Sequence, residues 1–310
     1  MMANKICRVR MSAVAAWIVV AVFAPGAAIA AEPAYEFRTV AGAGGVPLNV
    51  VMTGNRAGRP VLFVHGIGQS YLAFDNQFRS TLRQSLLLVA FDLRGHGNSG
   101  KPWNSEAYSD RALWAGDLDN VIRALGLRDP ILVGWSYGTL VVLDYVRVHG
   151  TQGVGGIVLT GAYGGLTQPG APQPPAPQFV RLREDLASAD LDRKWRAAHA
   201  MVRYLTARPM PAPWTERAAA ISLLLPQSAR VGMYLQAFDN TDLIPALQTV
   251  PMLLMIGGKD ASARESDGRQ LVAALPRARL EMYPADGHSL FVERPERFNR
   301  HLSGFVAALE

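Results

Sequence analysis

The 310-residue sequence has a single cysteine, Cys7, and little charge of either sign. One cysteine leaves no partner for an intrachain disulfide and no CxxC pair for redox or zinc chemistry. Charged residues make up 18% of the chain and hydrophobic residues 49%, which excludes global disorder and supplies a buried core. The length suits one large α/β domain with an insertion, or two small domains.

The sequence also lacks the motifs that indicate a bound cofactor. It has no P-loop, no G-x-G-x-x-G after an expected strand, and no cluster of residues with metal-ligand spacing. Its Lys and Arg residues are scattered and form no sustained stripe, so the net charge of +6 is weak evidence for a nucleic-acid partner. We therefore expect no cofactor, no metal, no nucleic-acid partner and a small-molecule substrate. The oligomeric state is left open.

The first 30 residues are typical of a secretory signal peptide. Lys5, Arg8 and Arg10 precede an apolar run over residues 11–23, and the small-residue pattern 28–30 offers a cleavage point before Ala31. The apolar run is short for a membrane span, which needs about 20 residues. We expect a periplasmic or secreted protein without stable membrane association after cleavage, and with a net charge reduced from +6 to +3 by loss of those three cations. A retained N-terminal anchor is the alternative.

Apolar runs and helical patterns alternate after residue 31, which is the signature of an α/β architecture. The runs are nearly continuous and end at Gly, His or Asp, as expected for a mostly parallel sheet that helices cover on both faces. Expected strands lie at 61–64, 86–91, 131–133, 156–160, 252–256 and 280–283, after two antiparallel strands within 35–52. Expected helices lie at 110–125, 137–148 and 297–309.

Residues 164–247 interrupt this alternation. They open with a proline-rich stretch, 167–177, and continue with helical patterns and no convincing strand. We interpret 164–247 as a helical cap or lid inserted into a core formed by 31–163 and 248–310. Met233 in this segment is a candidate for lining a substrate pocket, although it could equally pack the cap against the sheet.

The sequence Gly134-Trp135-Ser136-Tyr137-Gly138 matches G-x-S-x-G and lies between an expected strand and an expected helix. A sharp strand-to-helix turn exposes a serine hydroxyl, and the helix N-terminus directs amides and a positive dipole end at the reacting centre. Ser136 is therefore the candidate nucleophile. Trp135 is a second candidate for the pocket wall, although it could equally pack under the cap.

A serine hydroxyl needs a base, and the base needs an orienting acid. His288 follows the last expected strand, whereas His149, His199 and His301 lie in or beside helical segments. Asp260 directly follows the expected strand 252–256, at the edge where ligand crevices form. Asp286 is a weaker alternative, because it lies only two residues before His288 and is expected to shape its turn. The order Ser136, Asp260, His288 is that of α/β-hydrolases.

Four blocks carry a resemblance to the α/β-hydrolase superfamily, and most to its branch of cofactor-free haloperoxidase-like esterases and perhydrolases: 63–68, 91–99, 134–138, and 257–260 with 287–288. The resemblance implies an oxyanion hole made by the backbone N–H groups of Ile67 and Tyr137. It implies structural roles for His65 and for the turn 92–99. The serine at 136 differs from the aspartate nucleophile of epoxide hydrolases and haloalkane dehalogenases.

These features predict a serine hydrolase that cleaves small carboxylic esters or lactones through an acyl-enzyme. Two alternatives stay open: perhydrolysis or C–C bond hydrolysis on the same triad, and a non-catalytic ligand-binding protein that keeps the fold. The sequence does not specify the acyl group or the alcohol of the substrate.

Overall fold

The computed structural model describes residues 34–167 and 177–309. The signal-peptide prediction and most of the proline-rich stretch fall outside these residues. The described chain contains one eight-stranded sheet in the order β1-β2-β4-β3-β5-β6-β7-β8. The strands are β1 (Glu36–Ala41), β2 (Pro47–Gly54), β3 (Pro60–Val64), β4 (Leu87–Phe91), β5 (Ile131–Trp135), β6 (Gly156–Thr160), β7 (Met252–Gly257) and β8 (Ala278–Tyr283).

The sheet is antiparallel at one edge and parallel elsewhere. Strand β2 pairs antiparallel with β1 and β4, while every pairing from β4 to β8 is parallel. From β3 the chain goes to β4 on one side and then to β5 on the other. This reversal creates a topological switch point between β3 and β5, and ligands of open α/β sheets bind beyond the carboxyl ends of the strands at such a point.

Helices pack on both faces of the sheet and bury them. Along β3, Leu62 and Val64 belong to one apolar cluster and Val61 and Phe63 to another, because successive side chains point to opposite faces. The main helices of the sheet domain are α4 (Arg111–Ala124), α5 (Tyr137–His149), α11 (Glu265–Ala274) and α13 (Pro295–Ala307). The short ones are η1 (Ala43–Gly45), η2 (Tyr71–Phe74), α1 (Asp75–Phe78), α2 (Leu82–Ser85), α3 (Glu106–Ser109) and α12 (Leu290–Glu293). The predicted α/β fold class is confirmed.

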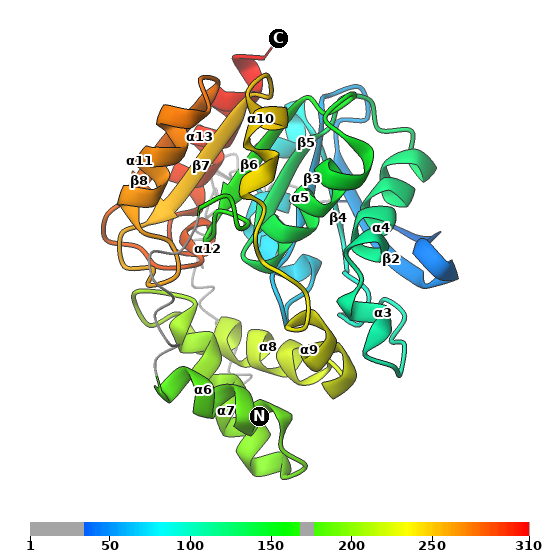
Figure 1. Cartoon of the computed structure of the whole chain (residues 1–310), viewed down its shortest axis with the longest axis vertical. Helices are drawn as coiled ribbons and strands as arrows, with labels where there is room; N and C mark the ends of the chain where they lie inside the picture. The colour runs from blue at the N-terminus through cyan, green and yellow to red at the C-terminus, as the bar shows by residue number, and fades with distance from the viewer. Residues whose placement is uncertain (1–33, 168–176, 310) are drawn as a thin grey trace, which may run out of the picture. The chain divides into compact units, whose positions relative to one another are not determined.

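Between β6 and β7 the described residues form helices and no strand. These are α6 (Pro177–Ala187), α7 (Leu191–Tyr204), α8 (Ala212–Leu223), α9 (Gln227–Met233), η3 (Thr241–Leu243) and α10 (Ile244–Leu247). Helices α6 to α8 share a small apolar cluster of their own, which includes Leu186, Ala198 and Val202. Figure 1 shows α6 to α9 gathered on the side toward which the arrowhead of β7 points. We call α6–α9 the helical segment.

Candidate active site

Ser136 lies in a backbone conformation that non-glycine residues rarely adopt. It stands between β5 and α5 with φ 54° and ψ −119°. Its amide donates to Thr160 O at 3.0 Å, and its carbonyl accepts from the Thr139 hydroxyl at 2.5 Å and the Thr139 amide at 3.0 Å. A Cβ added to Gly138 would lie 2.1 Å from Val64 O, so only glycine lets α5 approach β3 this closely. These contacts hold Ser136 at the sharp turn that the G-x-S-x-G pattern predicts.

The loop that follows β3 lies directly against the serine. A Cβ added to Gly66 would lie 2.9 Å from Ser136 Cβ and 3.4 Å from Ser136 Oγ. Within the described residues, the amides of Ile67 and Tyr137 donate to no backbone or side-chain acceptor. Tyr137 is the first residue of α5, where amide groups lack an intrahelical partner. Both amides are therefore free to donate to a ligand oxygen beside Ser136.

Asp260 and His288 form a close pair at the ends of β7 and β8. The distance from Asp260 Oδ2 to His288 Nδ1 is 2.8 Å, and the Asp260 side chain is 4% exposed. Burial alone would raise the pKa of the Asp260 carboxyl. The charge and hydrogen bond of His288, together with two hydrogen bonds from Ser262, outweigh burial and lower this pKa below its ordinary value. An ionised Asp260 holds the proton of His288 on Nδ1 and leaves Nε2 for another partner.

Ser262 joins this pair, although sequence reasoning did not single it out. Its hydroxyl donates to Asp260 Oδ1 at 2.5 Å and lies 3.1 Å from His288 Nδ1, and its amide donates to the same Asp260 oxygen at 2.9 Å. The only sequence signal is a hydroxyl residue two positions after an aspartate, which is common in ordinary Asx turns.

Trp135 links the serine turn to the His288 loop. Its indole N–H donates to the His288 carbonyl at 3.0 Å, and its ring lies 5.9 Å from the His288 ring. The side chain is 2% exposed and packs between Phe74 and Phe291. In the described chain Ser136 Oγ makes no hydrogen bond to His288, and such catalytic hydrogen bonds are often long in unliganded sites.

Among the described residues, Asp286 makes no hydrogen bond or ion pair with His288. Its carboxylate accepts from Arg294 Nε at 3.1 Å, and its carbonyl accepts the Lys259 amide at 3.0 Å. Glu293, which sequence reasoning did not consider, accepts the Gly287 amide at 2.6 Å and the Ala207 amide at 3.0 Å. Glu293 thereby ties the His288 loop to the connection between α7 and α8.

His65 uses both ring nitrogens to fix the loop that carries Ile67. Nε2 accepts the Leu93 amide at 3.0 Å, so Nδ1 carries the proton and lies 2.8 Å from Gly66 O. Burial lowers the pKa of His65, which favours this neutral form. These contacts fit a structural role.

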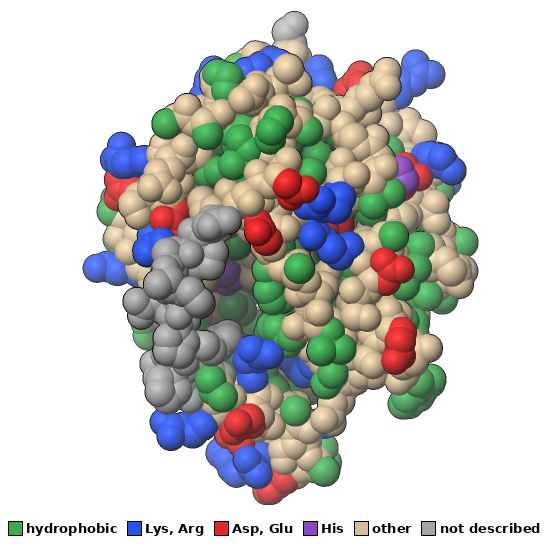
Figure 2. All heavy atoms as spheres, in the orientation of Figure 1, with side chains coloured by type: hydrophobic (Ala, Val, Ile, Leu, Met, Phe, Trp, Pro, Cys, Tyr) green, Lys and Arg blue, Asp and Glu red, His purple; other side chains and the backbone are tan. Residues whose placement is uncertain are grey.

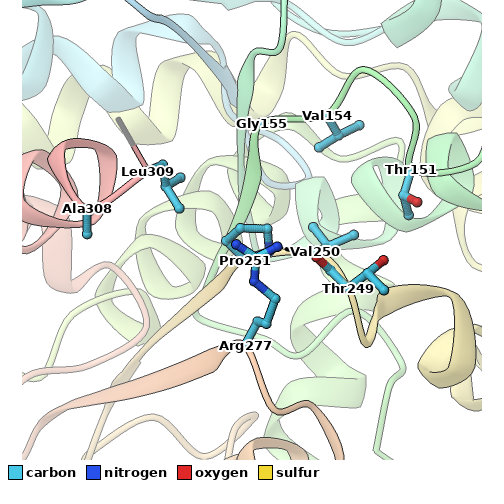
Figure 3. Close-up of a pocket in the computed structure, with 9 residues that line it drawn as sticks. All are labelled: Thr151, Val154, Gly155, Thr249, Val250, Pro251, Arg277, Ala308 and Leu309. Atoms are coloured by element: carbon cyan, nitrogen blue, oxygen red, sulfur yellow. Dashed lines mark hydrogen bonds between the residues drawn. The ribbon is translucent and has the colours of Figure 1, made fainter.

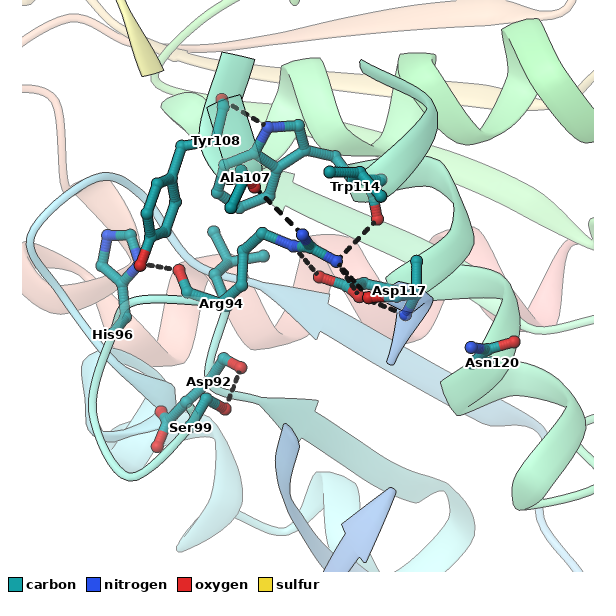
Figure 4. Close-up of polar contacts among 12 residues, drawn as sticks. Asp92, Arg94, His96, Ser99, Ala107, Tyr108, Trp114, Asp117 and Asn120 are labelled. Atoms are coloured by element: carbon teal, nitrogen blue, oxygen red, sulfur yellow. Dashed lines mark hydrogen bonds and ion pairs between the residues drawn. The ribbon is translucent and has the colours of Figure 1, made fainter. Parts of the chain in front are cut away.

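The turn that follows β4 is anchored by a buried ion pair. Figure 4 shows Arg94 with its guanidinium against Asp117 of α4 and toward the carbonyl of Ala107. The Arg94–Asp117 distance is 2.7 Å, and Arg94 also donates to the carbonyl of Leu113. Asp92 accepts the amides of Tyr71 and Asn98, at 2.8 and 2.9 Å. This network, too, fits a structural role for the turn.

Both predicted pocket residues are buried. Met233 is 0% exposed and belongs to the apolar cluster on the α4–α5 face, while Trp135 lies in the cluster on the opposite face. Their contribution to a substrate pocket stays a prediction.

A separate depression has a volume of about 390 Å³. It is lined by residues that precede β6 and β7, with Arg277 and Leu309 (Figure 3). It lies at the amino ends of these strands, away from Ser136.

Within residues 34–167 and 177–309, no group of three or more His, Cys, Asp or Glu side chains could hold a metal ion. Over the same ranges no helix is both long and apolar enough to cross a membrane.

Three features together define the α/β-hydrolase class of protein. The first is a Gly-flanked serine at a strained strand-to-helix turn, and the second is a free amide in the adjacent loop. The third is an Asp–His pair that follows β7 and β8 of the same sheet. A family model described as "Alpha/beta hydrolase family" matches residues 61–301, and the chain belongs to this family. A non-heme haloperoxidase of Rhodococcus erythropolis is 29% identical over 267 residues, which cover 81% of this chain and 93% of the relative.

Solved esterase structures share the fold over most of both chains. A putative aryl esterase from Burkholderia cenocepacia has a TM-score of 0.80 and 31% identity, with 88% of this chain and 99% of that chain covered. The esterase RhEst1 from Rhodococcus sp. ECU1013 has a TM-score of 0.77 and 30% identity, with the same shares covered. The chain is thus an α/β hydrolase with esterase and haloperoxidase-like neighbours.

Proposed function

We propose that this protein is a serine esterase whose catalytic triad is Ser136, His288 and Asp260. The observation that carries the proposal is the strained Ser136 turn on the same sheet edge as the 2.8 Å Asp260–His288 pair. Small carboxylic esters or lactones are the proposed substrates, since the neighbours include named esterases. The protein needs no cofactor or macromolecular partner for this reaction.

The proposed reaction has two stages, acylation of Ser136 and deacylation by water. Ser136 Oγ attacks the ester carbonyl while His288 Nε2 accepts its proton, and His288 then returns the proton to the leaving alcohol. Asp260 keeps the imidazole in the correct tautomer and stabilises its charged form. The amides of Ile67 and Tyr137 stabilise the oxyanion of each tetrahedral intermediate. Water, activated by His288, releases the acid and restores Ser136.

Perhydrolysis is a second candidate, because a relative that covers most of this chain is named a haloperoxidase. It would use the same acyl-enzyme with hydrogen peroxide in place of water.

We also propose that residues 1–30 direct export to the periplasm or the medium and are then removed, so the mature enzyme is not held at a membrane. Residues 164–247, with Met233 and Trp135, are proposed to shape and cover the acyl pocket.

Substitution of Ser136 tests the proposal. Ser136→Ala should lower kcat for p-nitrophenyl acetate by at least about 10³-fold, because the nucleophile is lost, while far-UV circular dichroism stays unchanged. A fluorophosphonate probe should label the wild type at Ser136 and leave the variant unlabelled. Ser80→Ala, at a serine whose hydroxyl donates to Gln77 O and accepts from the Leu82 amide, is the matched control and should keep wild-type turnover. Activity of Ser136→Ala within tenfold of the wild type would exclude the assignment.

A further inference from the structure

A cation without a carboxylate partner lies beside the loop that carries Ile67. The Arg230 guanidinium, from α9, donates through Nη2 to the Ser222 carbonyl and, at 3.1 Å, to the Ser222 hydroxyl. In the part of the chain that the structure describes, Nη1 and Nε donate to nothing, and Arg230 forms no ion pair with an Asp or Glu. The internal stretch 168–176 contains no acidic residue that could supply one.

Two other arginines that are buried or partly buried do have carboxylate partners: Arg94 pairs with Asp117 and Arg111 with Asp144. Burial lowers the pKa of Arg230 to about 10, and only the Tyr234 hydroxyl acts in the opposite direction. A buried guanidinium costs free energy unless an anion or several acceptors compensate it. The unmatched charge therefore favours an anion that arrives with a ligand.

The position of Arg230 connects it to the reaction. A Cβ added to Gly68 would lie 3.0 Å from Ser222 Oγ and 3.8 Å from Arg230 Nη1. Gly68 lies two residues after Gly66, the residue that approaches Ser136. Two residues of chain span at most about 7 Å. Figure 2 shows this face hollowed between the sheet domain and the helical segment, with Lys or Arg side chains along the helical side of the hollow. A ligand that reaches Ser136 can thus extend to Arg230.

We propose that Arg230 binds a second carboxylate on the substrate, so that the preferred esters are half-esters of dicarboxylic acids, with the ester at Ser136 and the free acid at the guanidinium. This inference rests on the proposed esterase function. The guanidinium suits a carboxylate, since Nη1 can donate a charge-assisted hydrogen bond to one of its oxygens. Ser222 orients the guanidinium by occupying Nη2.

The alternative role of Arg230 is to cap α8, because Ser222 is next to the last residue of that helix and cations stabilise the C-terminal carbonyls of helices. Capping uses Nη2 alone and predicts no dependence of turnover on substrate charge. A comparison of turnover for charged and neutral esters therefore distinguishes the two roles.

The test compares monoethyl esters of succinic, adipic, suberic and sebacic acid with neutral esters in which an isopropyl group replaces the carboxylate. The readout is ethanol release. For the best chain length, the wild type should favour the half-ester by at least tenfold in kcat/KM. Arg230→Gln should lower that ratio by at least tenfold, and Arg230→Lys should retain part of it, since the charge stays but the fixed orientation of the guanidinium donors is lost. Arg193→Gln removes an exposed charge paired with Asp185 and should leave the ratio unchanged.

Calorimetry with the four free dicarboxylates gives a readout that does not need turnover. At least one should bind the wild type at one site per chain, and the same ligand should bind Arg230→Gln at least tenfold more weakly. A wild type that hydrolyses the neutral esters as well as the half-esters at every length overturns the inference and leaves the esterase proposal intact. If no ester is hydrolysed, the esterase proposal fails, and calorimetry decides the anion site: absence of dicarboxylate binding overturns it.

Discussion

At the scale of single residues, Ser262 is positioned to act through the Asp260–His288 pair without touching substrate. Its hydroxyl contacts Asp260 at 2.5 Å and His288 Nδ1 at 3.1 Å, and also lies 3.2 Å from the carbonyl of Gly161. A hydrogen bond to a charged group is worth about 1.5–3 kcal/mol. Ser262 is thus a positioning residue that helps keep Asp260 ionised and His288 oriented.

We expect Ser262→Ala to lower kcat for p-nitrophenyl acetate by about tenfold with little change in KM, because one of several hydrogen bonds to Asp260 is lost. Asp260→Asn should be far more damaging, at about 10⁴-fold, since the amide favours the wrong tautomer of His288. Ser262→Thr keeps the hydroxyl and should restore most of the activity. A Ser262→Ala loss as large as that of Asp260→Asn, or no loss at all, would contradict this division of roles.

The sequence was enough to identify Asp260 and His288 as candidates because both directly follow strands, and parallel strands bring their carboxyl ends to one edge. It was not enough to find Ser262, Glu293 or Arg230. Their contacts depend on how loops distant in sequence meet: Glu293 accepts from Ala207, which is 86 positions away. The periodicity of the sequence carries no information about such contacts between distant loops.

At the scale of elements, α4 and α5 are joined by an ion pair. Arg111, the first residue of α4, contacts Asp144 of α5 at 2.5 Å and also donates to the Asp239 carbonyl. Burial raises the pKa of Asp144 to about 6, although Arg111 opposes that change. The pair compensates a charge that would otherwise be buried alone, and it helps fix the helix that starts at Tyr137.

We expect Arg111→Met to lower the free energy of unfolding by about 3 kcal/mol at pH 8, where Asp144 is ionised and left unpaired. The loss should shrink below pH 6, because a raised pKa in the folded state means that the folded protein takes up this proton more readily than the unfolded chain. Arg123→Met is the control on the same helix. Its side chain is 75% exposed and its pair with Asp119 should contribute less than about 1 kcal/mol. Urea unfolding at both pH values measures the difference, and equal effects of the two substitutions would refute the argument.

Elements with a strong apolar period were predicted within a few residues, whereas α11 was not. Its sequence carries Gly268 among polar residues, which weakens the helical pattern. The glycine is needed for packing, because a Cβ there would lie 2.5 Å from the Tyr163 hydroxyl. Tertiary contact therefore overrides local propensity in α11. The short helices α1, α2, α3 and α12 span one turn each, too short to show any period.

At the scale of the whole molecule, the order of strands explains why distant blocks form one site. Loops after β3 and β5 flank the switch point, and those after β7 and β8 supply the acid and the base. The helical segment enters between β6 and β7, and Glu293 ties its α7–α8 connection to the loop that carries His288. Substrate range is then expected to depend on the segment that carries Arg230 and Met233, while the chemistry depends on the sheet.

The proposed export leads to a prediction that rests on the N-terminal sequence alone. Signal peptidases need small residues at the cleavage point, so the natively expressed protein should begin within a few residues of Ala31. Ala30→Arg should block cleavage and leave the precursor in the membrane fraction, whereas Ala34→Arg, beyond the cleavage point, should be processed normally. Intact mass spectrometry of the protein from each cell fraction distinguishes these outcomes. A wild-type protein that still starts at Met1 or Met2 would show that residues 1–30 are kept, and its recovery with membranes would favour an N-terminal anchor.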